Sequence, residues 1–376
     1  MEILFENLLE LQFKQMIMWL IGGLLVYLAI KKDMEPTLLL PLGFGTILVN
    51  LPFTGAVTQI IDGVKEIGII DILFDAGIAN ELFPLLLFIG IGAMIDFAPL
   101  MANPKMLFFG AAAQFGIFFT FSLAALLGFD IKDAASIAII GAADGPTSIF
   151  VANYFNSKYI GAIIVAAYSY MALVPIIQPS VIRLITTRDE RRIRMEYPRK
   201  TVPKIAKILF PIIVTVIAGL IAPRSVALIG FLMFGNLIRE CGVLNSLSET
   251  AQKELANLIT ILLGITVSTK MQAELFLTKE TILILLLGLI AFIFDTVGGV
   301  LFAKIINLFS RKKINPMVGA CGISAFPMSA RVIHKMGLKE DPQNFLLMHA
   351  VGANVAGQIA SVIAGGLIIK LVGALL

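Results

Sequence analysis

The sequence predicts an all-α polytopic membrane protein, because it is too apolar for a water-soluble domain. Hydrophobic residues make up 58% of the 376 residues and charged residues only 14%, and the mean hydropathy is +0.94. Soluble domains carry roughly 25% charged residues. A helix that spans a bilayer needs about 20 mostly apolar residues. About ten segments are candidate spans: roughly 16–30, 36–52, 82–95, 106–129, 159–182, 205–222, 225–238, 255–269, 280–309 and 343–373.

Two further apolar segments, 133–154 and 314–336, are interrupted by glycine, proline and polar residues. The first contains the run Gly-Ala-Ala-Asp-Gly-Pro-Thr-Ser-Ile-Phe at 141–150. Broken backbone at membrane depth is tolerated only against protein or a water-filled cavity. We therefore expect two discontinuous or re-entrant elements that line an internal site.

Basic loops orient the chain and divide it. Segment 183–204 is rich in arginine and lysine, Lys31–Lys32 form a second basic loop, and Arg311–Lys313 form a third. Cytoplasmic loops carry the excess of positive charge. If all three lie inside, the two interrupted segments enter from opposite faces. The predicted parts are an N-terminal membrane half (1–182), a basic cytoplasmic connector (183–204) and a C-terminal membrane half (205–376).

The two interrupted segments also align with each other without gaps. The matched pairs are Gly141 and Gly322, Pro146 and Pro327, Ser148 and Ser329, and Val151 and Val332. Discontinuous helices that meet near the midplane build the ion site in transporters with inverted repeats. The alignment favours two halves of inverted topology, although small residues also recur in any membrane helix.

The first interrupted segment offers the chemistry of a cation site. Asp144, Thr147 and Ser148 bring oxygen atoms, and Gly145 and Pro146 free backbone carbonyls. Oxygen ligands suit a small hard cation, and an acid inside a membrane is functional by default. Na⁺ and H⁺ would compete for the one carboxylate. The alternative is a packing kink in which the aspartate only caps a half-helix.

The second interrupted segment is neutral except for one arginine. Asn315, Ser324 and Ser329 are candidate neutral ligands, and Arg331 is a fixed cation. Because arginine grips carboxylates with two parallel hydrogen bonds, Arg331 is a candidate for binding an anionic substrate. It could equally be a cytoplasmic arginine whose charged end reaches the membrane surface.

Polar residues elsewhere converge on the same region. Asn354, Gln358 and Ser361 fall on one face of an apolar helix, so they should face the protein interior, as ion ligands or as contacts between helices. Tyr168 and Tyr170 lie near the start of the candidate span 159–182. A buried phenol can donate a proton, whereas one at the interface is an aromatic-belt residue.

Several other functions lack support in the sequence. Two cysteines and two histidines form no metal-binding pattern, and no nucleotide-binding GxxxxGK[ST] run is present. The net charge of +4 gives no reason to expect nucleic acid, because the basic residues flank the membrane. The residues alone indicate a protein that handles Na⁺ or H⁺ with an anionic second substrate, either a secondary transporter or an ion-pumping enzyme.

Several motifs resemble those of the β subunits of the biotin-dependent, sodium-transporting carboxylic acid decarboxylases. They are the run at 141–150, Ile91–Phe97, Ala111–Gly116 and Tyr168–Pro175. Asn315–Arg331 and His349–Ser361 resemble the C-terminal half of that family, and the similarity covers roughly 85–370.

The resemblance implies an activity, cofactors and partners. The family's β subunit takes carboxybiotin from a biotin carrier subunit, decarboxylates it, consumes a proton and exports Na⁺. Implied partners are a carboxyltransferase α subunit, a small membrane-anchoring subunit, further copies of the chain in a homo-oligomer such as a trimer, and the lipid bilayer of the bacterial cytoplasmic membrane. The short chain resembles the glutaconyl-CoA and methylmalonyl-CoA members more than the oxaloacetate members.

The resemblance also implies roles for residues, which mostly coincide with those above. The predicted catalytic residues are Asp144, Tyr170 and Arg331; the substrate contacts are Arg331, Ser324 and Tyr170; and the metal ligands are Asp144, Thr147, Asn315, Gly319, Ser324 and Asn354. Two alternative functions stay open. A Na⁺-coupled carboxylate transporter would use the same residues without a biotin carrier, and a Na⁺/H⁺ antiporter would need Asp144 but not Arg331.

Overall fold

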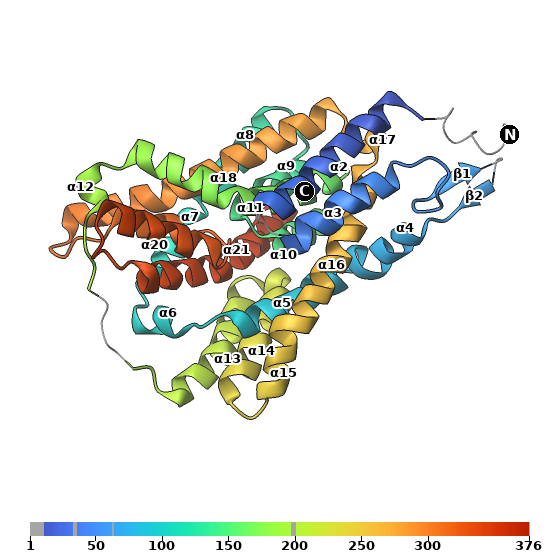
Figure 1. The fold of residues 1–376 in the computed structure, drawn as a ribbon. Helices are drawn as coiled ribbons and strands as arrows, with labels where there is room; N and C mark the ends of the chain where they lie inside the picture. Colours follow the sequence, from blue (N-terminus) through green and yellow to red (C-terminus); the bar gives the residue numbers. More distant parts are fainter. Residues whose placement is uncertain (1–10, 33–35, 62–63, 197–200, 376) are drawn as a thin grey trace.

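The structure is a computed structural model that describes residues 11–32, 36–61, 64–196 and 201–375, and this part of the chain is almost entirely helical (Figure 1). Among the described residues, β1 (Gln59–Ile61) pairs with β2 (Val64–Glu66) in an antiparallel arrangement. Within these residues seven helices are long and apolar enough to cross a membrane, or eight if one bent pair counts as a span. The predicted fold class, an all-α polytopic membrane protein, is confirmed.

The N-terminal half consists of α2 (Phe13–Lys32), α3 (Pro36–Val49), α4 (Ile69–Phe74), the π-helical turn η1 (Asp75–Ala79), α5 (Leu82–Met94), α6 (Ala98–Ala102), α7 (Met106–Ala113), α8 (Phe115–Leu126), α9 (Ile131–Ala138), the 3-10 turn η2 (Ile139–Ala142), α10 (Gly145–Tyr154) and α11 (Ile160–Ile185). The short helix α12 (Arg188–Arg191) lies in the predicted connector. Arg199 and Lys200 of that connector fall outside the described residues.

The C-terminal half consists of α13 (Lys204–Ile221), η3 (Pro223–Ser225), α14 (Val226–Cys241), α15 (Asn245–Thr250), the π-helical turn η4 (Ala251–Leu255), α16 (Ala256–Val267), η5 (Ser268–Met271), α17 (Ala273–Phe276), α18 (Lys279–Phe309), α19 (Pro316–Gly319), the 3-10 turn η6 (Ala320–Gly322), α20 (Met328–Glu340) and α21 (Leu347–Leu375). The expected spans 36–52 and 225–238 are the short helices α3, with 14 residues, and α14, with 16.

The order of elements repeats between the halves. Each half has two helices, a segment with a π-helical turn, a long apolar stretch, a helix broken at a 3-10 turn, and a long last helix. The segment with the π-helical turn is continuous over Asn245–Met271, but in the N-terminal half it is bent by 59° between Ile69–Ala79 and Leu82–Met94. The breaks at η2 and η6 fall inside the two segments that were predicted to be interrupted. The halves differ in the long stretch, which is split at Gln114 between α7 and α8 but continuous in α18.

The packing between the halves is reciprocal. Helix α3 packs against α16 while α14 packs against α5, and α11 packs against α18 while α21 packs against α7. In Figure 1, α5 lies beside α14 in one region, and α7, α18 and α21 lie in the other. Such an exchange of partners is what a two-fold axis produces. It supports the repeat, and the opposite membrane orientation of the halves stays a prediction.

Glycines let the paired helices approach backbone to backbone. A Cβ atom on Gly92 of α5 would lie 1.8 Å from the carbonyl oxygen of Leu232 in α14, and one on Gly264 of α16 would lie 3.0 Å from that of Leu38 in α3. Close packing over small residues drives association of helices in lipid, where burial of apolar surface contributes little.

We expect Gly92→Ala to separate α5 from α14. Because the obstructing atom is backbone, the added methyl group should cost about 1–3 kcal/mol of stability, as overpacking usually does. The measurement is the midpoint of thermal unfolding in detergent. Gly23→Ala in α2 is the matched control, since nothing lies within 4 Å of its added Cβ. Equal midpoints for the two variants would contradict the close approach.

Candidate functional site

Asp144 lies at the break between η2 and α10. Ala143 adopts a left-handed conformation, with φ 50° and ψ 45°, which turns the chain before Asp144 caps α10. Asp144 is 4% exposed. It accepts hydrogen bonds from the Thr147 amide at 3.4 Å, the Thr147 hydroxyl at 2.8 Å and the Ser361 hydroxyl at 3.1 Å. The positive end of the α10 dipole also stabilises a negative charge there.

The second interrupted segment meets the first at Ser324. The Ser324 amide donates to the Ala142 carbonyl at 3.0 Å, which joins the two breaks backbone to backbone. Its hydroxyl contacts the Gly357 carbonyl at 3.0 Å and the Ser361 hydroxyl. Asp144, Ser361 and Ser324 therefore form one buried polar network across α10, α21 and the loop after η6.

Side-chain amides cap the carbonyls that the second break frees. The Gln114 side-chain amide donates to the Gly322 carbonyl at 3.3 Å, and the Asn354 amide donates to the Ile323 carbonyl at 2.6 Å. The Gln358 amide donates to the Ser324 carbonyl. The amide oxygens of these three side chains are buried and have no hydrogen-bond partner within the described residues. They are oxygen atoms of the kind that a hard cation binds.

A cavity of about 280 Å³ opens beside the Asp144 network. Its lining includes Asp144, Tyr168, Asn257, Ser324, Pro327 and Gln358. The ring of Tyr168 rests directly on Gly145, where a Cβ atom would lie 2.1 Å from the ring. The volume is near the lower end of ligand pockets, roughly 300–1,000 Å³. The carboxylate of Asp144, the amide oxygen of Gln358 and the hydroxyl of Ser324 fit a cation, and the helix N-terminus fits an anion.

Neither of the predicted catalytic partners of Asp144, Tyr170 and Arg331, lines this cavity. The Tyr170 hydroxyl donates to the Leu285 carbonyl of α18, and Tyr168 is the tyrosine that lines the cavity. Arg331 is exposed on α20, one helical turn beyond Pro327, and forms no ion pair with the described residues. Its exposed guanidinium is available to an anion.

Two predicted metal ligands have other contacts in this structure. Asn315 caps α19, and its side-chain amide donates to the Arg191 and Ile193 carbonyls at 2.9 Å each. Gly319 lies against Gly299 of α18, where a Cβ on Gly319 would be 2.0 Å from the Gly299 carbonyl oxygen. Neither residue lines the cavity beside Asp144. Their roles as ligands stay predictions.

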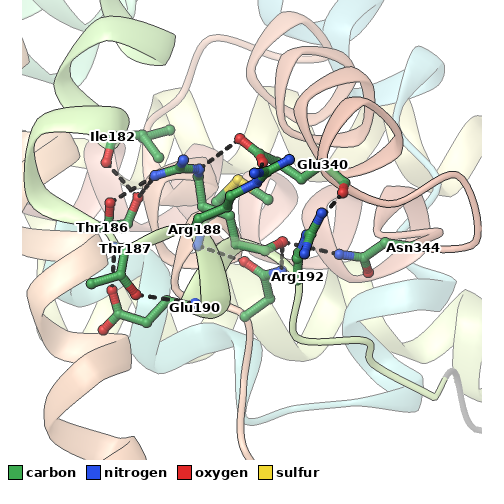
Figure 2. Close-up of polar contacts among 11 residues, drawn as sticks. Ile182, Thr186, Thr187, Arg188, Glu190, Arg192, Glu340 and Asn344 are labelled. Carbon is green, nitrogen blue, oxygen red and sulfur yellow. Dashed lines mark hydrogen bonds and ion pairs between the residues drawn. The ribbon is translucent and has the colours of Figure 1, made fainter.

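The connector binds to the acidic end of α20. The Arg191 side chain pairs with Glu340 at 2.8 Å, and Arg194 pairs with Asp341 at 2.6 Å. Figure 2 shows Arg188 and Arg192 reaching to Glu340 and Asn344 lying beside them. The connector thereby closes over α19 and α20, the elements that carry the second break.

A second buried acid, Asp295 in α18, was not predicted from the sequence as a site residue. It is 0% exposed and lies against Gly141, three residues before Asp144. The signal was present, because Asp295 interrupts the apolar span 280–309, and the rule that marked Asp144 applies equally to it.

The comparisons with known proteins agree with this architecture. The family model described as the Na⁺-transporting oxaloacetate decarboxylase beta subunit matches residues 14–372. The chain belongs to the family of Na⁺-transporting decarboxylase β subunits. It is similar to the glutaconyl-CoA decarboxylase subunit beta of Acidaminococcus fermentans, with 50% identity over 357 residues, 95% of this chain and 93% of the relative.

Two further relatives of this β-subunit family come from other complexes. The methylmalonyl-CoA decarboxylase subunit beta of Veillonella parvula is 51% identical over 350 residues, 93% of this chain and 91% of the relative. The probable oxaloacetate decarboxylase beta chain of Vibrio cholerae is 44% identical over 421 aligned residues, 97% of each chain. The resemblance read from the motifs is confirmed. This β subunit is a multi-pass membrane protein of a multi-subunit decarboxylase linked to Na⁺ and biotin chemistry.

The connector should detach from α20 in acid. The hydrogen bond from Arg191, with the nearby arginine charges, holds the pKa of Glu340 below its usual range against the opposing effect of desolvation. At a pH above the ordinary pKa of a glutamate, about 4.3, Glu340 is ionised and stabilises the bound connector fully. This stabilisation is lost as the pH falls through the lower pKa that Glu340 has in the folded protein.

At neutral pH we expect Glu340→Gln to reproduce this release. The rate of trypsin cleavage after Arg191 and Arg192, followed by mass spectrometry, should rise several-fold because the ion pairs are lost. Glu254→Gln, at an exposed acid on η4, is the control. Equal cleavage of the two variants would show that Glu340 does not hold the connector.

Proposed function

We propose that this β subunit decarboxylates carboxybiotin and couples the release of CO₂ and the uptake of a proton to the export of Na⁺. The observation that supports it most is the Asp144 carboxylate, which is buried where two broken helices meet and lies beside a cavity that Gln358, with its unpartnered amide oxygen, also lines. A pump needs one group that can exchange a metal cation for a proton, and a carboxylate in that setting can bind either.

The ion-binding side of this proposal rests on Asp144 and its neighbours. The candidate ligands are Asp144, Thr147, Ser324 and Asn354, with Asn315 and Gly319 proposed from the family pattern. Asp144 already accepts two hydroxyl hydrogen bonds, directly from Thr147 and Ser361. A bound Na⁺ would neutralise the carboxylate and recruit the unpartnered oxygen of Asn354. Protonation of Asp144 removes its charge and so releases the cation.

The substrate side rests on Arg331, Ser324 and Tyr170. Carboxybiotin supplies an N-carboxylate whose C–N bond breaks to give CO₂ and a ureido nitrogen that takes up one proton. Arg331, exposed on α20, holds the carboxylate, and Ser324 contacts the substrate from the break after η6. Tyr170 passes the proton toward that nitrogen.

The partners follow from the proposed reaction. A biotin carrier subunit presents carboxybiotin at the face closed by the connector, and a carboxyltransferase α subunit loads it. A small membrane-anchoring subunit and further copies of this chain, as in a trimer, complete the assembly in the bacterial cytoplasmic membrane. Identities of 50% and 51% with the glutaconyl-CoA and methylmalonyl-CoA relatives favour an acyl-CoA substrate for the complex.

Asp144→Asn should abolish Na⁺-stimulated decarboxylation. The amide keeps the shape of the acid but can neither bind Na⁺ as a charge nor take up a proton, so turnover should fall by at least about 100-fold, the scale of a lost proton-transfer group. The measurement is the release of CO₂ from free carboxybiotin by the reconstituted protein with and without Na⁺. Full Na⁺-dependent turnover of the variant would exclude Asp144 as the coupling group. Carboxylate uptake without CO₂ release by the parent protein would favour a symporter.

Arg331→Ala should weaken the use of carboxybiotin more than the binding of Na⁺. Loss of a hydrogen bond to a charged group costs about 1.5–3 kcal/mol, so KM for carboxybiotin should rise about 10- to 100-fold. The Na⁺ concentration for half-maximal activity should stay close to that of the parent. Arg331→Lys should recover part of the loss, because it keeps the charge without the paired geometry. Equal weakening of both ligands would count against a substrate role.

A further inference from the structure

Asp295 lies at the centre of the packing around the first break. It belongs to α18 and is 0% exposed. Its Oδ1 atom accepts a hydrogen bond from the Ile117 amide at 3.1 Å, so it caps the N-terminus of α8, where the chain is split after Gln114. Its side chain therefore replaces the capping residue that α8 does not supply itself.

The other carboxyl oxygen of Asp295 is unpartnered. Oδ2 has no hydrogen bond with any described residue, and a Cβ atom on Gly141 of η2 would lie 2.7 Å from it. No lysine or arginine in the described ranges forms an ion pair with Asp295. A carboxylate buried so deeply without a cation costs far more free energy than the neutral acid does.

The elements packed against α18 offer little compensating charge. Helices α7, α8 and α19 and the turn η2 carry no ionisable side chain, and η6 carries only Cys321. On α9, Lys132 is exposed, and Asp133 binds the Ser157 hydroxyl at 2.7 Å. Helix α11 carries Arg183 near its far end, together with Tyr168 and Tyr170, of which Tyr170 faces α18.

A proton fits this site better than a metal ion does. Na⁺ needs several oxygen ligands, such as the hydroxyls and amide oxygens around Asp144. Oδ2 of Asp295 meets the backbone of Gly141 instead, and a proton needs only one oxygen. The acid remains a good cap when it is protonated, because Oδ1 keeps its hydrogen bond from Ile117.

Tyr170 occupies the same face of α18. Its ring would lie 2.9 Å from a Cβ on Gly288, about two turns from Asp295 in a helix of about 3.6 residues per turn. The turn η2 lies between the two, with Ile140 on Gly288 and Gly141 on Asp295. A shift of the chain before Asp144 would therefore change the surroundings of Asp295 and Tyr170 together.

We propose that Asp295 is a second proton-binding site, which holds a proton in the Na⁺-loaded protein and gives it up toward Tyr170 when η2 shifts. In this step the O–H bond of Asp295 breaks and the ureido nitrogen of biotin finally gains the proton. The transfer of the proton to biotin rests on the proposed decarboxylation of carboxybiotin, whereas the binding of a proton by Asp295 does not depend on it.

Infrared spectroscopy of the purified protein, saturated with Na⁺ at neutral pH, tests the bound proton. A carbonyl stretch of a protonated carboxyl that shifts in D₂O should be present in the parent, in Asp144→Asn and in the control Asp133→Asn, and lost in Asp295→Asn. Persistence of the full band in Asp295→Asn overturns the proposal. If that variant does not fold, carbon NMR of the aspartate-labelled parent decides, since a spectrum with every aspartate ionised also overturns it.

Turnover of the assembled decarboxylase complex tests whether the proton is used. Asp295→Asn should slow CO₂ release by about 100-fold, as expected for a lost proton-transfer group, with unchanged half-saturation by Na⁺. Turnover within twofold of the parent overturns a coupling role. A parent complex that binds Na⁺ but leaves carboxybiotin intact refutes the proposed function instead, and the infrared result still decides whether Asp295 carries a proton.

Discussion

The structure depends on how two broken helices satisfy their backbone groups without water. A peptide group left unpaired at membrane depth costs several kcal/mol, so neither break could exist alone. The Ser324 amide meets the Ala142 carbonyl across the break, and amides of Gln114, Asn354 and Gln358 cover the next carbonyls. This requirement gathers the polar side chains that could also hold an ion. The same side chains thus support the fold and furnish the candidate site.

Much of the fold was predictable because apolar length and helix-breaking residues are local signals. Composition predicted the class, and glycine with proline near 145 and 327 located both breaks. The lengths of α3 and α14 were not predictable in this way, because the ends of short packed helices depend on their neighbours. The reciprocal packing of α3 on α16 and α14 on α5 also lies beyond any local pattern. Its traces in the sequence were the weak internal alignment and the positions of the three basic loops.

Helical periodicity predicted the part of the candidate site that lies on one helix face. Asn354, Gln358 and Ser361 share a helix face, and all three are buried against the second break, as that spacing indicated. Asn315 was assigned from its residue type, and only the folded connector shows that its amide is engaged by Arg191 and Ile193. Tyr168 and Tyr170 are two residues apart and so point to different neighbours, a distinction that requires the helix phase. Asp295 could have been predicted from the sequence alone, because the rule that marks an acid within a membrane span as a candidate site residue applies to it as it does to Asp144.

One hydroxyl in the Asp144 network has a consequence for communication between the halves. Ser361 carries a single hydrogen but has two acceptors at 3.1 Å, the Asp144 carboxylate and the Gln358 carbonyl. An ionised Asp144 draws that hydrogen toward itself, while Ser324 donates to the Ser361 oxygen. Once Asp144 gains a hydrogen of its own, it no longer needs the Ser361 hydrogen, and the Ser361 hydroxyl turns to the Gln358 carbonyl of its own helix. The direction of this one hydroxyl therefore depends on the protonation of an acid in the other half, with no movement of the backbone.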